Sequence, residues 1–282
     1  MMATLELRPS PIAGTWYPSN PERLARSIDH FLDEARLPEL EGEVVAVIAP
    51  HAGHKYSGVT AGHAFRSVRG KSYPRVALLS PMHGYHPAPF LTSAHKGYQT
   101  PLGPVWIDRE GLISLEKAME ARQLPGLTPL AHDGEHAVEI ELPFLQRALA
   151  AEFRLMPLMV RTHRPEELRA LGEALAETLA AYPALLVAST DLSHFFALPV
   201  ANRLDAAILA RVANFSPEEV LDAEEKGTGF ACGVGALAAV LWAARALGAT
   251  SVEIVHHSTS ADQTGDESSV VGYGAAVILK KS

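Results

Sequence analysis

The sequence predicts a single α/β domain over residues 1–282, with three α/β/α layers and a largely parallel central sheet. Strand-like and helix-like patterns alternate along the chain, which is typical of a parallel sheet covered by helices on both faces. Hydrophobic residues make up 48% of the 282 residues, enough for a large core, and charged residues only 20%. No repeat or low-complexity linker divides the chain, which favours one domain.

The first half of the chain predicts helices from apolar residues at 3.6-residue spacing and strands from buried apolar runs. Leu24, Ile28, Phe31 and Leu32 define the first helical face. The expected strands are 44–49, 76–79, 89–92 and 105–107, and the expected helices are 21–35, 58–68, 109–121 and 135–150.

The second half continues the alternation. Pro157 interrupts the strand 153–160 and indicates an edge position or a bulge, whereas Pro165 suits the first turn of a helix. Gly248 ends a strongly apolar helix. The expected strands are 153–160, 185–188, 252–255 and 270–279, and the expected helices are 165–181, 204–214, 217–225 and 232–247.

Composition excludes several classes of protein. The net charge of −8 and the lack of Lys/Arg runs argue against nucleic-acid binding. A single cysteine, Cys232, excludes an intrachain disulfide, and Glu6 and Arg8 precede any apolar stretch, unlike a secretory signal. The longest apolar run, 234–244, is too short for a membrane span. We therefore expect a soluble, cytoplasmic protein.

Histidines follow three of the predicted buried strands. His51 follows 44–49, His83 follows 76–79, and His194 follows 185–188. In an open α/β sheet, ligands bind in the crevice outside the carboxyl ends of the parallel strands. Imidazoles delivered there from separate strands, together with the thiol of Cys232, are the components of a mononuclear metal site.

Each of these residues also has a simpler interpretation. His51 could cap its strand, and His194 could be a metal ligand or a general base oriented by Asp191. A Ser–His–Asp nucleophile is unsuitable here, because Ser193 lies within the same four residues as Asp191 and His194, whereas a triad converges from separate elements. Cys232 could simply fill core space.

Two further segments carry candidate groups. Cys232 is expected at the start of a helix, where unpaired N–H groups and the helix dipole would lower the pKa of the thiol and favour the metal-binding thiolate. Asp133 suits the N-cap of the helix predicted over 135–150. Glu135 and His136 then follow at a helix start, where they could support the site or transfer protons. His86 is expected in a loop between prolines.

Taken as a set, the motifs resemble the Memo family, the B component of the AmmeMemoRadiSam system, over essentially the whole chain. The matching stretches are Ala13–Pro18, Ala49–Gly53, Tyr56–Gly58, Ser80–His83, Thr100–Gly103, Glu135–His136, Glu141–Leu145, Ser189–His194 and Ala231–Gly233. The resemblance implies a fold like that of class III extradiol dioxygenases (LigB-like), in which two histidines and a carboxylate hold iron(II). It differs at His54, where the family usually has Tyr, and at Met82 and Gly84.

Carried over by residue, the resemblance implies that His51, His83 and Cys232 bind one transition metal ion and that His194 matches the dioxygenase base. Cysteine in place of a carboxylate shifts the preference toward softer ions, so copper or zinc joins iron as a candidate. The AmmeMemoRadiSam set further implies a radical-SAM protein and a third component as partners. A small-molecule substrate and a homo-oligomer are also possible.

Three functions remain open. The first is a metal-dependent, dioxygenase-like oxidoreductase acting on a small molecule, in which His194 moves a proton and Asp191, Glu135 and His136 assist. The second is a non-catalytic metal carrier or accessory protein that works with the radical-SAM partner. The third is a zinc hydrolase using a metal-activated water.

Overall fold

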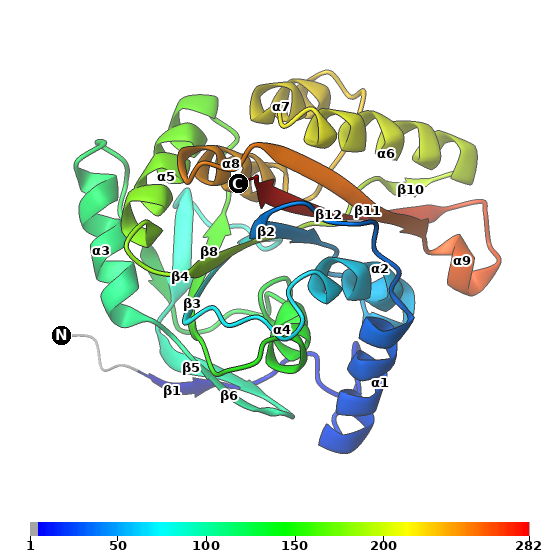
Figure 1. The fold of residues 1–282 in the computed structure, drawn as a ribbon, viewed down its shortest axis with the longest axis horizontal. Helices are drawn as coiled ribbons and strands as arrows, with labels where there is room; N and C mark the ends of the chain where they lie inside the picture. Colours follow the sequence, from blue (N-terminus) through cyan, green and yellow to red (C-terminus); the bar gives the residue numbers. More distant parts are fainter. Residues whose placement is uncertain (1–4, 282) are drawn as a thin grey trace.

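A large mixed sheet runs through the centre of the protein (Figure 1). The structure, a computed structural model, describes residues 5–281, and in this range the sheet has nine strands in the order β10-β12-β2-β9-β3-β8-β4-β7, with β11 paired to β12. Its strands are β2 Glu43–Ala49, β3 Arg75–Pro81, β4 Phe90–Ser93, β7 Thr128–Leu130, β8 Arg154–Val160, β9 Ala184–Ser189, β10 His194–Phe196, β11 Ser251–Thr259 and β12 Val270–Lys280.

The centre of this sheet is parallel, as the sequence predicts. Strands β2, β9, β3 and β8 run in the same direction, so β2, β9 and β3 bring their carboxyl ends to one edge. Antiparallel neighbours lie on either side of this parallel block: β12 pairs with β2, and β4 with β8. Residues on the β2, β9 and β3 ends are therefore adjacent in space.

Helices cover both faces of the sheet (Figure 1). Helices α1, α2 and α4 pack on one face, and α3, α5, α6, α7 and α8 pack on the other, which gives the expected α/β/α layers. Their bounds are α1 Pro21–Glu34, α2 His54–Arg66, α3 Arg109–Glu120, α4 Leu142–Ala148, α5 Pro165–Leu179, α6 Leu198–Ala213, α7 Pro217–Glu225 and α8 Val234–Ala246, with the short α9 Ala261–Thr264 and the 3-10 turn η1 Glu139–Glu141.

Helix α1 illustrates how the sequence specifies these elements. The Asn20 side chain accepts a hydrogen bond from the Arg23 N–H (2.9 Å), which caps the helix, and Pro21 occupies the first turn. Leu24, Ile28 and Leu32 are fully buried, as their spacing predicts. Fully burying such a side chain stabilises the fold by about 1.5–3 kcal/mol.

A small second sheet lies beside the large one. Strand β1 (Leu5–Arg8) pairs in parallel with β5 (His95–Thr100), which pairs antiparallel with β6 (Gly103–Trp106). Buried side chains from around both sheets form one continuous hydrophobic cluster. The assignment of residues 1–282 to one Memo-like domain stays a prediction. Within residues 5–281, no helix has both the length and the apolar character to cross a membrane.

Two of the predicted elements are wrong in detail. The helix predicted over 135–150 is reduced to η1 and α4. Pro143 lacks the N–H that would join these two elements into one helix, and before η1 the N–H groups of His136 and Ala137 bind the Glu135 carboxylate. Strand β8 is neither an edge strand nor bulged at Pro157: it lies between β3 and β4 in unbroken register with β3. The proline is tolerated because β4 pairs only with Met159 and Val160.

Candidate metal centre

A pocket of about 450 Å³ opens at the carboxyl ends of β2, β9 and β3. His51 follows β2, His83 follows β3, and Asp191 and His194 follow β9, so the strand-end crevice brings together the residues that the sequence singled out. The pocket is lined by Thr15, Trp16, His51, Ala52, Gly53, Lys55, Tyr56, His83, His136, Asp191, His194 and Val271.

Buried hydrogen bonds fix the orientation of His51. Ser189 Oγ donates to the Ala137 carbonyl (2.8 Å), which can only accept, so His51 Nδ1–H donates to Ser189 Oγ (3.0 Å). This leaves a lone pair on His51 Nε2, which Cys232 Sγ contacts at 3.0 Å. Burial is the main cause that holds the pKa of His51 well below its usual value, and the charges of His136 and His83 add to it. The low pKa favours the neutral imidazole that binds metals.

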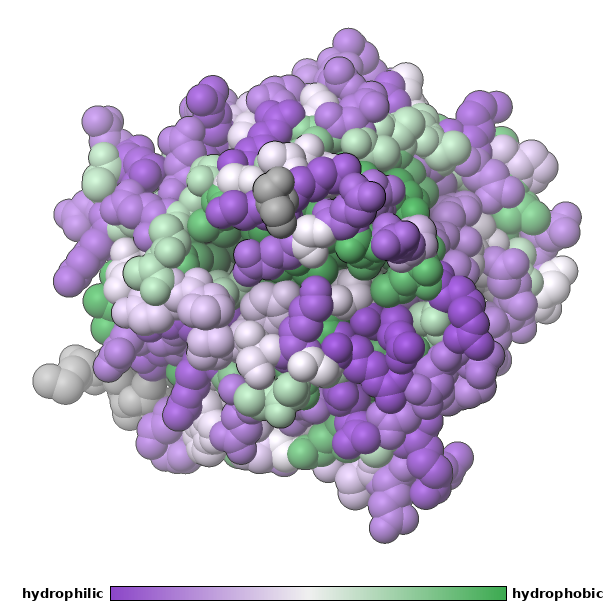
Figure 2. Space-filling view, viewed as in Figure 1, coloured by the Kyte–Doolittle hydropathy of each residue, from purple (hydrophilic) through white to green (hydrophobic). Residues whose placement is uncertain are grey.

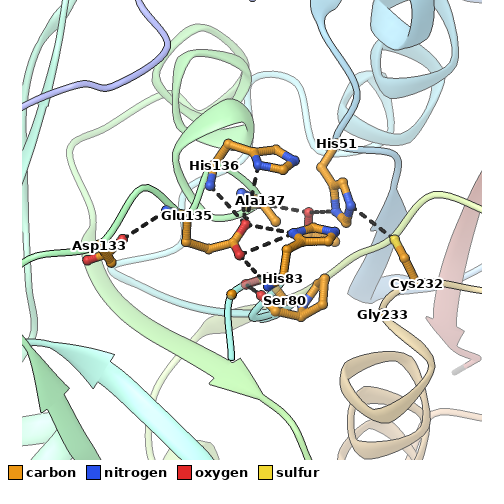
Figure 3. A network of polar contacts seen from close by, with 12 residues as sticks. His51, Ser80, His83, Asp133, Glu135, His136, Ala137, Cys232 and Gly233 are labelled. Atoms are coloured by element: carbon orange, nitrogen blue, oxygen red, sulfur yellow. Dashed lines mark hydrogen bonds and ion pairs between the residues drawn. The ribbon is translucent and has the colours of Figure 1, made fainter. Parts of the chain in front are cut away.

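Glu135 fixes His83 in a similar way (Figure 3). Its carboxylate accepts from the His83 N–H (2.6 Å) and lies 3.0 and 3.1 Å from His83 Nδ1. It also accepts from the N–H groups of His136 (2.8 Å) and Ala137 (3.0 Å). Burial alone would raise the pKa of Glu135, but these bonds outweigh it and lower the pKa to about 2. The Glu135 hydrogen bond raises the pKa of His83, whose Nε2 stays unblocked.

His136 completes a compact group of three histidines. One ring nitrogen from each of His51, His83 and His136 lies within 4.8 Å of the others. Nitrogens about 2.1 Å from one tetrahedral metal ion lie roughly 3.4 Å apart, so a small contraction would satisfy an ion. The His83 and His136 rings are stacked, with centroids 4.8 Å apart, and Trp16 covers His136 at 4.2 Å. Burial lowers the pKa of His136 to about 4. The donors present therefore fit a transition metal.

Cys232 contacts His51 from the side away from His83 in the view of Figure 3. Its Sγ is 3.0 Å from His51 Nε2 and accepts the Asp191 N–H at 3.2 Å. The expectation of a lowered pKa is wrong: helix α8 begins at Val234, and burial raises the pKa of the buried thiol. The sulfur is not part of the compact histidine group, although it adjoins one member. Its role as a ligand stays a prediction.

Asp191 and His194 share the pocket but are held separately. Asp191 Oδ1 accepts the His51 N–H (2.8 Å), and the Leu192 carbonyl, rather than Asp191, holds His194 Nδ1 (2.8 Å). The expectation that Asp191 orients His194 is therefore wrong. Burial raises the pKa of Asp191 to about 7 and lowers that of His194, so His194 is neutral at pH 7 and able to accept a proton. The catalytic roles of Glu135, His136, Asp191 and His194 stay predictions.

A strained residue follows His194. Phe195 has a φ of 64°, in the left-handed region that bulky residues rarely adopt, and its side chain is 75% exposed. Such strain persists where the surrounding structure imposes it and is common near functional sites. Here β10 pairs irregularly with β12 around this residue, and the neighbouring His194 lines the pocket.

The departures from the family pattern lie outside the histidine group. His54 is buried against Phe144, with centroids 5.0 Å apart, and its Nε2 meets the Ile140 carbonyl (3.2 Å). Gly84 is exposed, and Met82 is partly buried against the core. His86 lies in a loop, as expected.

Ser189 and Arg8 support the site but were not predicted from the sequence. Ser189 could have been found, because it ends the same strand that precedes Asp191. Asp133 is not an N-cap but pairs with Arg8 at 2.6 Å, and no local pattern connects these two distant residues.

A family model and individual relatives of known sequence both indicate the same family for this chain. Residues 8–277 match the family model described as Memo-like protein. A MEMO1 family protein of Methanopyrus kandleri is 32% identical over 95% of this chain and 98% of its own length. One from Aquifex aeolicus is 32% identical over 98% of this chain and all of its own length.

Among solved structures, an uncharacterized protein of Escherichia coli K12 matches 83% of this chain and all of its own. Its TM-score is 0.45 and its sequence identity is 11%, a likeness too distant to carry an argument.

Proposed function

The chain belongs to the Memo-like family, and we propose that it binds one transition metal ion at the strand-end pocket and uses it in redox chemistry on a small molecule. The observation that carries the proposal is the group of ring nitrogens from His51, His83 and His136 within 4.8 Å of one another. Hydrogen bonds at Nδ1 of His51 and His83 keep the lone pairs of both rings on Nε2, which is the usual arrangement of metal-binding histidines. On His51, an ion would replace the present contact between Nε2 and Cys232 Sγ.

His51 and His83 are two of the proposed ligands. The third is Cys232, as the family resemblance implies, or His136, which belongs to the compact group. Nitrogen and sulfur donors suit iron, copper or zinc. The bound ion would supply an acceptor of electrons and an open position for the reactant. The proposed setting is the cytoplasm, where a free thiol such as Cys232 stays reduced.

The residues around the ion would bind and orient the reactant. Trp16 and Tyr56 are partly exposed and line the pocket, so they offer flat apolar surfaces to a small organic molecule. Neutral His194, with Nδ1 held by the Leu192 carbonyl, would accept a proton at Nε2. Turnover of a catechol panel should be lost in His194→Ala while the metal is retained. Absence of turnover by the metal-loaded wild type would remove the redox proposal.

Elemental analysis of protein purified without added metal tests the site itself. We expect about one equivalent of metal per chain in the wild type and a large loss in His51→Ala. Loss in Cys232→Ser with retention in His136→Ala would select the thiol as the third ligand, and the reverse would select His136. Wild-type protein that neither retains nor takes up iron, copper or zinc would overturn the proposal.

A second candidate is a non-catalytic metal carrier or accessory protein that works with a radical-SAM partner and a third component. The position of Cys232 beside His51 favours it, because three imidazoles and one thiolate would fill a tetrahedral ion and leave no open position. Metal binding that needs both His136 and Cys232, without turnover, would support this candidate.

A further inference from the structure

A buried arginine of the small sheet contacts the loop that carries Glu135 and His136. Arg8 ends β1, and its side chain is only 3% exposed. Nη2 donates to Asp133 Oδ1 and to the Glu135 carbonyl, both at 2.6 Å, and Nη1 donates to Glu139 Oε2 at 2.8 Å. One guanidinium thus binds three residues within seven positions of the chain.

This loop cannot position itself through its own secondary structure. Residues 131–138, between β7 and η1, include no helix or strand. The loop nevertheless delivers both groups that the metal centre needs from this side: the Glu135 carboxylate, which fixes His83, and the His136 ring. Its placement therefore depends on contacts with the rest of the molecule.

The charges make Arg8 hard to replace. Asp133 and Glu139 have side chains that are 4% and 1% exposed, and Arg8 pairs with both. Ser10 and Tyr17 also donate to Glu139, but neither is charged. Without Arg8, these two buried carboxylates would lack a cationic partner. A movement of the loop that exposes them to water would then lower the free energy. Lysine has no planar fork and could not bind three acceptors in the same geometry.

We propose that Arg8 is a positioning residue of the metal centre, which holds loop 131–138 so that Glu135 reaches His83 and His136 faces His51. Among the described residues, Arg8 makes no hydrogen bond to any of the three histidines, so it acts only through the loop. The inference rests on the proposed metal site.

The test is zinc affinity, measured by chelator competition on the purified full chain. Loss of groups that orient metal ligands costs about 10- to 100-fold in affinity, and we expect Arg8→Gln to fall in this range. Arg8→Lys, which keeps the charge, secures a folded variant and should lose an intermediate amount. Arg75→Gln is the matched control, because Arg75 pairs with Asp108 at 2.7 Å, is 17% exposed, and lies at the opposite end of β3 from His83. It should keep wild-type affinity.

A double-mutant cycle separates positioning from general destabilisation. In a Glu135→Ala/His136→Ala background, the loop delivers neither a support for His83 nor a ring to the ion, while His51 and His83 remain as donors. Adding Arg8→Gln there should cost no more than about threefold, since coupled residues are non-additive. An equal loss in both backgrounds, or wild-type affinity in Arg8→Lys and Arg8→Gln, would overturn the inference. Failure of the wild type to bind zinc, iron or copper would instead overturn the proposed function.

Discussion

Replacing Glu135 by glutamine should show how much the hydrogen bonds of its buried carboxylate, including those from His83, contribute to the free energy of unfolding. The carboxylate side chain is 2% exposed and accepts from the N–H of His83, His136 and Ala137 and from His83 Nδ1. A glutamine oxygen in the Oε1 position can keep the bonds from His136, Ala137 and His83 Nδ1, but its NH₂ then faces the His83 backbone N–H, which donates to Oε2 at 2.6 Å in the wild type. Hydrogen bonds to a charged group contribute about 1.5–3 kcal/mol each, so Glu135→Gln should lower the free energy of unfolding by about 3 kcal/mol.

The pH dependence gives an independent check. The pKa of Glu135 falls from 4.5 to about 2 on folding, equivalent to about 3 kcal/mol. A lowered carboxyl pKa stabilises the fold fully above pH 4.5, and this stabilisation is lost as pH falls toward 2. The pKa of His83 is raised from 6.5, so its contribution is full below pH 6.5 and is lost at higher pH. The difference between wild type and Glu135→Gln should therefore be largest between about pH 4.5 and 6.5.

Urea unfolding of metal-free protein at pH 3, 5.5 and 8 measures these differences. Glu166→Gln is the control, because Glu166 is 63% exposed in its pair with Arg164 and should change stability by less than about 0.5 kcal/mol. A difference below about 0.5 kcal/mol for Glu135→Gln at pH 5.5, or one that grows toward pH 3, would refute the reasoning.

Three more predictions concern the metal and the packing around it. Zinc at a hundred times its dissociation constant should stabilise the wild type by about 2.7 kcal/mol in thermal unfolding, and His51→Ala should abolish the shift. Ser189→Ala frees His51 Nδ1 and should weaken zinc binding about tenfold in competition assays; unchanged affinity would contradict this. Gly272→Ala would place a Cβ 1.9 Å from Asp205 Oδ2, so urea unfolding should show a loss of about 3 kcal/mol, and near-wild-type stability would disprove the clash.

Much of the fold could be predicted because its signals are local. Buried apolar runs predicted β2, β3 and β9, and the histidines that follow them converge because parallel strands end at one edge. The apolar spacing of α1 needed no tertiary information. The helix predicted over 217–225 agrees with α7 in both bounds; in the structure the Ser216 side chain caps it and Pro217 stands in its first turn.

The site was harder to predict where distant contacts decide the structure. A helix was predicted over 135–150, but at its start the N–H groups of His136 and Ala137 bind the Glu135 carboxylate instead of helix carbonyls. Arg8 and Asp133 are 125 positions apart, so no window of sequence reveals their pairing. The thiol of Cys232 was expected to be acidic from helix position alone, whereas its environment is dominated by burial.

The pairing of β12 with β2 has a consequence for how the chain folds. Strand β12 joins β2 through pairs such as Ile48 with Ala276, which unite the first and last quarters of the polypeptide. Contacts between such remote segments slow folding, because a long loop must close before they form. During synthesis, one flank of β2 stays unpaired until β12, which follows it far along the chain, has been translated. A nascent chain would thus expose one unpaired flank of the apolar strand β2 until β12 is synthesised, which is when chaperone protection would matter most.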